Sequence, residues 1–235
     1  MRLRCLLVAA ALPVLADQRG WEVLEAALQA AGGREKLLAV RDLSFDLDSH
    51  VVSTQGEFDI QSRSRMVFPD TVRQDSKMPF GDMSMALDSR SGWRQGPTGA
   101  VEVPPAELKR VQADVARANI LFRPPADSAA VRWVAEESVA GRPCDIIEIA
   151  AVGGAPMRLS VDRQTRDVVK RSYRAEAPGG GMAAVEEIIS DFRQIDGLRL
   201  SFKVRVLRDG KLARESGTRN LKINSGLNAE ELLRR

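Results

Sequence analysis

Three residues whose side chains can bind a metal recur at alternate positions: Asp46, Asp48 and His50. In an extended strand, alternate residues share one face and lie about 7 Å apart, so the three would form a row. A catalytic zinc usually needs three protein ligands that converge on one point. A row of charged residues is instead typical of the solvent-facing side of a strand. We therefore predict no metal site here.

Hydrolytic chemistry has little support in this sequence. A hydrolytic triad needs a base that is oriented against a nucleophile, and His50 is the only histidine in the chain. Ser62, Ser64 and Ser84 have no partner pattern around them, and Asp191 is typical of a strand-face or turn carboxylate. We predict that the protein is not an enzyme and uses no cofactor.

The chain has two cysteines, Cys5 and Cys144. Cys5 lies in an N-terminal segment that we expect to be removed, which leaves Cys144 without an internal disulfide partner. Free cysteine is usually a small buried hydrophobic residue. We therefore expect Cys144 to be a buried strand residue.

Residues 1–16 have the layout of a secretory signal peptide. Arg2 and Arg4 precede an apolar run over residues 6–15, and small or modest residues precede a plausible cleavage site before Asp17. The alternative is a buried N-terminal helix. The run is too short to span a bilayer, so we expect no stable membrane insertion. We predict an exported protein, periplasmic if the host has an outer membrane, with residues 17–235 forming one domain.

Composition excludes some classes of partner. Removal of residues 1–16 takes away two arginines and lowers the formal net charge from +3 to +1. The charges are interspersed, and no basic run with aromatic residues is present, so we expect no nucleic-acid binding. Hydrophobic residues make up 44% of the chain but aromatic residues only 5%, so aliphatic side chains and methionine must fill most of the core.

Hydrophobic periodicity divides the chain into helices and strands. It predicts helices at residues 21–33, 34–40 and 104–122, and a short helix or tail at residues 227–235. Alternation of apolar and polar residues predicts four to five strands between residues 43 and 103 and about six from residue 131 onward, and it leaves residues 91–99 as a turn-rich tip. Asp-Gly pairs at 196–197 and 209–210 are strong hairpin signals because both central residues of a type I′ turn need positive φ.

This order of elements predicts a mostly β protein with helices, of the α+β class. One apolar face per strand is typical of an antiparallel sheet with one face covered and one face wet. We expect a single curved antiparallel sheet, or unclosed β-barrel, with N-terminal helices and a central helix lying in the concave face. A division into two domains near Pro124 and Pro125 is the alternative, although no long linker supports it.

Five segments of the chain resemble the periplasmic outer-membrane lipoprotein-sorting family, the LolA/LolB-like group. They are residues 26–43, 141–149, 157–173, 186–206 and 221–233. The resemblance implies an unclosed antiparallel barrel whose apolar cavity is covered by helices. It also implies a relation to proteins that carry lipoprotein acyl chains across the periplasm. No functional residue of the family can be matched to a particular position in this chain.

Apolar residues of the N-terminal strands and of the central helix are the candidates for a ligand cavity, because flexible methionines suit surfaces that bind variable ligands. The predicted lining is Phe58, Ile60, Met66, Phe68, Met83, Met85, Leu87, Leu108, Val111, Val115 and Phe122. The alternative is that these residues form an ordinary core.

From this cavity we expect a carrier or sensor that binds a lipid, an acyl chain or a lipoprotein. A cell-envelope module that binds a protein partner through the same fold is the alternative.

Overall fold

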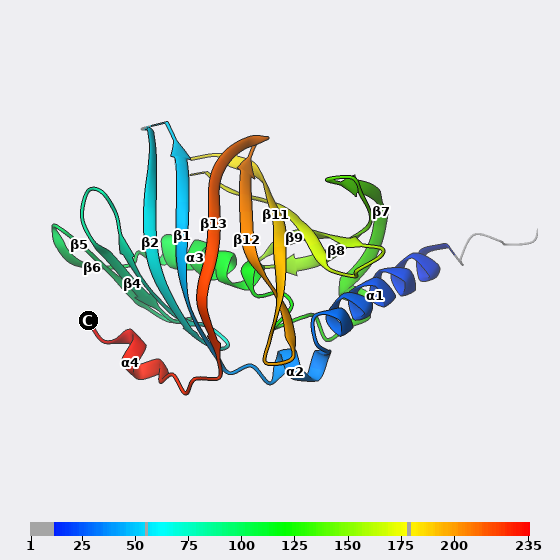
Figure 1. Ribbon diagram of the computed structural model, residues 1–235, viewed down its shortest axis with the longest axis horizontal. Coiled ribbons are helices and arrows are strands. Elements are labelled where there is room, and N and C mark those ends of the chain that lie inside the picture. The colour runs from blue at the N-terminus through cyan, green and yellow to red at the C-terminus, as the bar shows by residue number, and fades with distance from the viewer. Residues whose placement is uncertain (1–11, 55, 178–179) are drawn as a thin grey trace, which may run out of the picture.

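A computed structural model describes residues 12–54, 56–177 and 180–235 of the chain (Figure 1). The helices are α1 (Leu12–Ala30), α2 (Arg34–Leu38), α3 (Pro105–Ala118), the 3₁₀ helix η1 (Ser128–Ala130) and α4 (Ala229–Leu233). The strands before α3 are β1 (Asp42–Ser53), β2 (Gly56–Val67), β3 (Thr71–Lys77), β4 (Met83–Leu87), β5 (Gly92–Gly96) and β6 (Gly99–Glu102). The strands after it are β7 (Val131–Val139), β8 (Arg142–Val152), β9 (Ala155–Asp162), β10 (Val168–Glu176), β11 (Met182–Ile195), β12 (Leu198–Arg208) and β13 (Lys211–Ile223).

All of these strands belong to one antiparallel sheet with the order β6-β5-β4-β3-β2-β1-β13-β12-β11-β10-β9-β8-β7. Neighbours in the sheet are consecutive in the chain except at one place, where β1 pairs with β13. Strands β6 and β7 form the two edges and are not paired with each other, so the barrel is not closed. The predicted fold class is confirmed.

Hairpin turns form where the sequence predicts them. Asp196 and Gly197 have φ of +50° and +77°, and Asp209 and Gly210 have φ of +47° and +75°. Positive φ at both central residues matches the strand twist of a tight antiparallel hairpin, which explains why Asp-Gly stands at both places. These turns set the register of the long strands β11, β12 and β13.

Helix α1 packs on the inner face of the sheet, meaning the face that α1 and α3 cover. Leu24, Leu28 and Leu37 are fully buried, and they join a core that includes Ile147 and Leu159 of β8 and β9. The helix reaches the sheet closely at Gly20, where a Cβ atom would lie 2.5 Å from the backbone of β7. The main core therefore fills the inner face over β7 to β9.

Helix α1 extends beyond the predicted range. It begins at Leu12, so residues 12–16 of the predicted signal peptide are helical here. Residues 1–11 of that segment lie outside the described residues. The predicted end is confirmed, because the helix stops at Ala30, and Gly32 and Gly33 follow with positive φ.

Two elements differ from the sequence prediction. The segment predicted as a turn-rich tip around Trp93 forms the hairpin β5–β6, and Trp93 is a buried strand residue with 6% of its surface exposed. The central helix was predicted to run to Phe122, but α3 ends at Ala118 with Asn119 outside helical geometry. Phe122 lies in the following turn, and its ring centroid is 5.5 Å from that of Phe68.

Cys144 is fully buried in β8, as predicted. It lies beside Val139 and Val169 in a small hydrophobic cluster. Burial raises the pKa of its thiol above the usual value. A buried thiol that is protonated at neutral pH is typical of a packing residue and not of a nucleophile.

The C-terminal helix α4 is attached to the outer face of the sheet. Asn228 caps it by accepting hydrogen bonds from two backbone N–H groups of the first turn. The guanidinium of Arg73 donates to the backbone carbonyl of Arg234 at 2.7 Å, and the Trp93 indole donates to that of Leu233 at 2.6 Å. Leu232 is buried, with 4% exposed.

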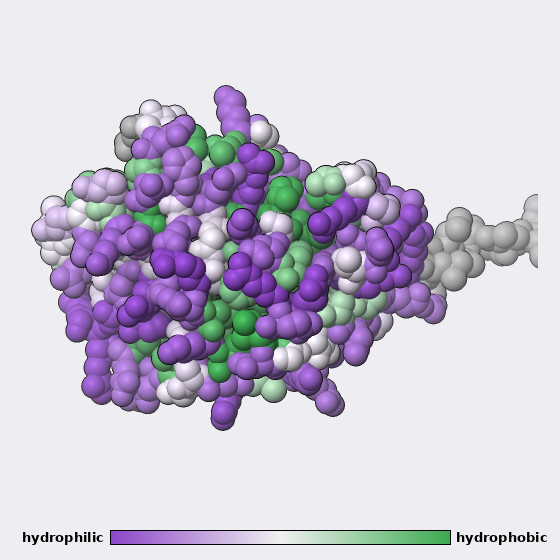
Figure 2. All heavy atoms as spheres, viewed as in Figure 1, coloured by the Kyte–Doolittle hydropathy of each residue, from purple (hydrophilic) through white to green (hydrophobic). Residues whose placement is uncertain are grey.

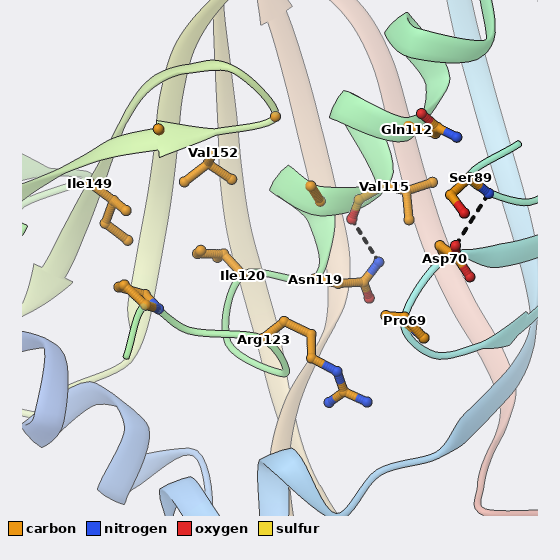
Figure 3. Close-up of a pocket in the computed structure, with 14 residues that line it drawn as sticks. Pro69, Asp70, Ser89, Gln112, Val115, Asn119, Ile120, Arg123, Ile149 and Val152 are labelled. Atoms are coloured by element: carbon orange, nitrogen blue, oxygen red, sulfur yellow. Dashed lines mark hydrogen bonds between the residues drawn. The ribbon is translucent and has the colours of Figure 1, made fainter. Parts of the chain in front are cut away.

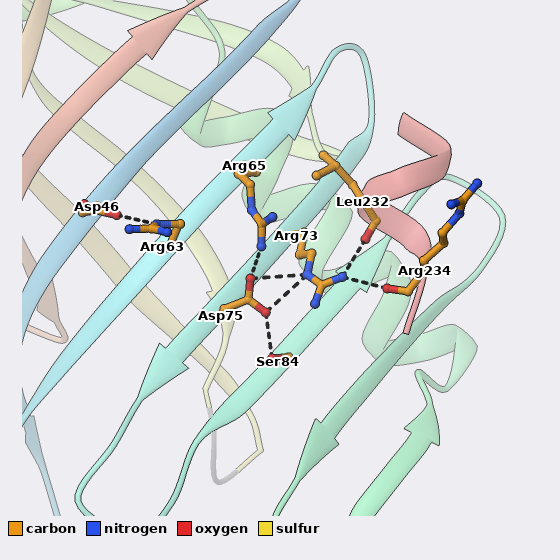
Figure 4. A network of polar contacts seen from close by, with 8 residues as sticks. All are labelled: Asp46, Arg63, Arg65, Arg73, Asp75, Ser84, Leu232 and Arg234. Carbon is orange, nitrogen blue, oxygen red and sulfur yellow. Dashed lines mark hydrogen bonds and ion pairs between the residues drawn. The ribbon is translucent and has the colours of Figure 1, made fainter. Parts of the chain in front are cut away.

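Asp75 fixes the side chain of Arg73, the arginine that holds α4 (Figure 4). Its carboxylate accepts from Arg73, from Arg65 and, at 2.7 Å, from the hydroxyl of Ser84. Burial alone would raise the pKa of Asp75, but the hydrogen bond from Ser84 and the charges of Arg73 and Arg65 outweigh it and lower the pKa.

Asp75→Asn should lower the free energy of unfolding by about 1–3 kcal/mol at pH 7, because two guanidinium groups lose their charged partner. A lowered pKa contributes stability above the unfolded value of about 3.9 and loses it as the pH falls through the folded value. The difference between wild type and variant should therefore shrink below about pH 4. Urea unfolding across pH measures this, with Asp82→Asn as the control. A difference that stays constant down to the acid limit would contradict it.

Candidate functional site

Helix α3 lies on the inner face because it must connect the two edges of the sheet. It leaves β6 through Val103 and returns, by way of residues 119–130, to β7. Its apolar side packs at one end on β4, where Leu108 and Val111 meet Leu87 and Met85. In Figure 1, α3 passes behind β1, β13 and β12. The helix therefore bridges the gap of the unclosed barrel.

The structure places the predicted cavity residues in several different surroundings. Met85, Leu87, Leu108 and Val111 pack on one another in a cluster with Val103. Leu87 and Leu108 are buried in this cluster, whereas Met85 and Val111 are only partly buried.

Phe68 and Phe122 belong to the main core, so Phe122 does not lie on the apolar stripe of the central helix as expected. Met66 is also buried. Phe58, Ile60 and Met83 are partly exposed, and the ring of Phe58 makes an edge contact with that of Phe80 at 5.6 Å. Only Val115 among the predicted residues lines the groove that is described next.

A groove runs along α3 between the two halves of the sheet (Figure 3). Its volume is about 490 Å³, which is within the usual range for ligand sites of roughly 300–1,000 Å³. Its apolar side is formed by Val115 and Ile120 with Ile149 and Val152 of β8. Turns of the N-terminal strands form the opposite side. The groove therefore lies between β8 and these turns, with α3 and the turn after it along its length.

Polar groups hold the walls of the groove in place. The amide of Gln112 donates to the backbone carbonyl of Asp88 at 2.7 Å, which ties α3 to the β4–β5 turn. The amide of Asn119 donates to the carbonyl of Val115 at 2.8 Å and completes the last turn of the helix. Both contacts end on backbone carbonyls, which periodicity in the sequence does not reveal.

Serines interrupt the apolar inner face over β1, β2 and β3. Ser62 and Ser64 alternate between Ile60 and Met66 on the same face of β2, and both are buried. The Ser62 hydroxyl lies 2.8 Å from that of Ser76 on β3. The same alternation that identified the apolar residues places these serines, but the sequence analysis considered them only as nucleophiles. The inner face is thus apolar only in part.

A buried polar cluster fastens the end of α3 to β10 and β11. The Tyr173 hydroxyl donates to Glu187 at 2.8 Å, and Arg171 Nε lies 2.7 Å from the other oxygen of that carboxylate. Arg171 also donates to the backbone carbonyls of Arg117 and Ala118. The guanidinium of Arg117 lies 4.6 Å from the centre of the Tyr173 ring. This cluster fixes the position of the helix above the sheet.

The electrostatics of the cluster keep it in one protonation state. Burial first, and then the negative charge of Glu187, raise the pKa of Tyr173 far above its usual value. The phenol therefore stays protonated and continues to donate its hydrogen bond at neutral pH.

Nε of Arg117 and Nη1 of Arg208 are buried with no hydrogen-bond partner among the residues that the structure describes.

The row of Asp46, Asp48 and His50 lies on the outer face, where its members bind different partners. Asp46 accepts from Arg63 and Asn220, while Asp48 pairs with Arg219. The hydrogen bonds of His50 to Asp59, at 2.9 Å, and to Glu57 raise its pKa above 6.5. The three side chains do not converge. Within residues 12–54, 56–177 and 180–235, no group of histidine, cysteine or acidic side chains is arranged to hold a metal ion.

A second hollow of about 680 Å³ lies on the outer face over Gly217, which has no side chain to fill it. Its walls carry charged groups such as Lys203, Arg205 and Glu215. Figure 2 shows that this side of the molecule is covered mainly by hydrophilic side chains. It is larger than the groove beside α3, but a larger share of its lining is polar. We therefore take the groove as the candidate site.

Gly153 permits the close approach of α3 to the sheet. A Cβ atom there would lie 2.7 Å from both Cα and Cβ of Ala113, and its φ is +62°. Gly154 also has positive φ, at +84°, but a Cβ atom there would meet nothing within 4 Å. The two neighbouring glycines thus share a positive φ, and only Gly153 lies close to α3.

Gly153→Ala should destabilise the protein more than Gly154→Ala by about 1–3 kcal/mol, the usual cost of overpacking. Both substitutions place an alanine at a positive φ, so the difference between their free energies of unfolding measures the contact with Ala113. Urea unfolding measures each free energy, and the rate of hydrogen exchange of residues 105–118 should rise only in Gly153→Ala. Equal effects of the two substitutions would show that α3 does not rest on Gly153.

Solved structures with the same architecture cover nearly the whole chain at low sequence identity. A LolA superfamily protein from Nitrosomonas europaea matches with a TM-score of 0.62 and 11% identity over 92% of this chain and 97% of that one. A DUF1329 family protein from Desulfovibrio piger gives 0.58 and 12%, over 91% and 96%. A domain assigned to an outer-membrane lipoprotein-sorting protein from Vibrio parahaemolyticus gives 0.56 and 10%, over 92% and 97%.

The comparisons define the fold. No protein-family model matches the sequence, and no curated protein matches it either. The structural matches show that the chain has the LolA-like fold, so the resemblance noted in the sequence is confirmed at that level. Among the described helices, none combines the length and the apolar character needed to cross a membrane.

Proposed function

We propose that this chain of LolA-like fold is an exported carrier or sensor that binds an acyl chain of a lipid or lipoprotein in the groove beside α3. The observation that carries the proposal is the apolar side of that groove, formed by Val115, Ile120, Ile149 and Val152. No covalent step is part of the proposal.

The energetics of an acyl chain suit such a groove. Burial of one methylene contributes about 0.8 kcal/mol, so even eight buried methylenes offer roughly 6 kcal/mol before the cost of ordering the chain. The site is open to solvent along one side, which favours exchange over permanent retention. A carrier needs this combination of moderate affinity and access.

Structural relatives support the class of ligand only by analogy. Two of them are named for the LolA superfamily or for lipoprotein sorting. At 10–12% identity the likeness concerns the fold, and one fold can serve several functions. The proposal therefore rests on the groove itself, and a substitution in the groove is the direct test.

Val115→Glu should reduce the affinity for a fluorescent fatty acid at least tenfold, because a carboxylate on the apolar wall must lose its hydration when the chain binds. Val115 is only partly buried, so the free energy of unfolding should change by less than about 1 kcal/mol. Val101→Glu is the matched control, since Val101 is 50% exposed on β6 and lies outside the groove. Fluorescence titration and urea unfolding of all three proteins measure the two effects.

A second candidate function is a cell-envelope module that binds a protein partner. All four residues of β6 are exposed, and this edge strand has an unpaired side that an extended peptide could join. If the wild type binds no acyl probe, the carrier proposal fails and this second function is favoured.

Export is part of the proposal and rests on the arginines and the apolar run of residues 1–16. Protein purified from the envelope fraction of its own host should begin near Asp17. N-terminal sequencing measures this directly. A mature protein that retains Met1 would contradict cleavage.

A further inference from the structure

Arg123 brings a positive charge to the groove without a negative partner. Its guanidinium donates to the backbone carbonyls of Phe122, at 2.5 Å, and Val40, at 2.8 Å, and lies 4.1 Å from the centre of the Phe68 ring. It forms no ion pair with any carboxylate of the described residues. Burial lowers its pKa, and no nearby charge opposes this effect. A negative group in the groove would restore the balance of charge.

Asp70 brings a negative charge to the same groove. Its carboxylate accepts a hydrogen bond from the backbone N–H of Ser89 at 3.2 Å. Asp70, like Arg123, has no oppositely charged partner in the part of the chain that the structure describes. Asp46, Asp48 and Asp75 on the neighbouring strands, by contrast, all pair with arginines. Among the described residues, Asp70 and Arg123 thus bring one charge of each sign to the groove without an ion pair.

The charges and the apolar surface occupy different parts of the groove (Figure 3). Ile149 and Val152 of β8 lie on one side, and Asp70 and Ser89 lie on the other. The Arg123 side chain extends along the bottom of the view from the turn after α3. This division suits an amphiphile whose chain covers the apolar side and whose head carries charges of both signs.

We propose that the groove selects amphiphiles with a zwitterionic head that contains a phosphate and a primary ammonium, as in phosphatidylethanolamine. The phosphate would pair with Arg123, and the ammonium would donate to Asp70. This inference rests on the proposed function, because it names the class of lipid that the same groove binds.

Other heads complement the groove less well. A fatty-acid carboxylate or a phosphatidylglycerol head could pair with Arg123 but would leave Asp70 facing negative charge. A phosphatidylcholine head carries both signs, but its quaternary ammonium has no N–H to donate to the Asp70 carboxylate. Charge-assisted hydrogen bonds are roughly twice as strong as neutral ones, so the primary ammonium should be preferred.

Lysophospholipids that share one acyl chain and differ only in the head test this selection. Used below their aggregation concentration as displacers of the fluorescent fatty acid, lysophosphatidylethanolamine should bind about 3- to 10-fold more tightly than the choline and glycerol forms. The same chain in all three keeps the apolar contribution constant.

Asp70→Asn isolates the ammonium contact. The amide oxygen can still accept from Ser89, so the turn should be retained. The variant should lose about 3- to 10-fold in affinity for the ethanolamine form and none for the glycerol form. Asp82→Asn, outside the groove, should leave all three affinities unchanged.

Arg123→Gln isolates the phosphate contact and should weaken all three phospholipids. Since Arg123 also holds two loop carbonyls, Arg123→Lys, which keeps the charge, should recover part of the affinity, and urea unfolding must confirm that both variants are folded. Loss of folding in both would leave Asp70→Asn to decide.

Equal binding of the three heads, with no effect of Asp70→Asn, would overturn this inference and leave the carrier proposal intact. A wild type that binds none of the amphiphiles would overturn both.

Discussion

The pairing of β1 with β13 is the constraint on which the rest of the molecule depends. It joins residues as far apart as Leu43 and Ile223, which are 180 positions apart, whereas all other neighbouring strands are consecutive in the chain. This pairing merges the meander of β1 to β6 and that of β7 to β13 into one curved sheet. The free edges then fall at β6 and β7, and α3 must cross the inner face to connect them. The position of the groove follows from that crossing.

Much of the fold could be predicted because its signals are local. Alternation identified the strands, and Asp-Gly at 196–197 and 209–210 identified hairpins that the structure contains. Errors arose where tertiary contacts decide. Trp93 lies in a strand because α4 covers it, and α3 ends at Ala118 because Phe122 is needed in the main core against Phe68.

The groove was harder to predict than the fold. Periodicity shows which face of an element a residue occupies, but not whether another element fills the space opposite. Met85 and Leu108, which we predicted to line a cavity, belong to one hydrophobic cluster with Leu87 and Val103. Asp70 and Arg123 lie in turns, where no repeating pattern marks them, and they line the same groove because the fold brings both turns to α3. Of the predicted lining residues, Val115 lines this groove.

The main core and the groove share residues on the inner face. Helix α1 fills the region over β7 to β9 with fully buried residues such as Leu24 and Leu28. The buried contacts of Tyr173 and Arg171 hold the end of α3 in place. The apolar side of the groove is the border of this core, because Ile120, Ile149 and Val152 line the groove and are themselves buried core residues. Packing therefore holds that side of the groove in place.

The way in which α4 is held has a consequence for tolerance to sequence change. Arg73 and Trp93 contact backbone carbonyls at Arg234 and Leu233, which every amino acid possesses. Only Leu232 is recognised through a buried side chain. Substitutions at positions 233 and 234 should therefore be tolerated in evolution, while deletions that move the carbonyls out of reach should be selected against. The position of the backbone in this segment matters more than the side chains that it carries.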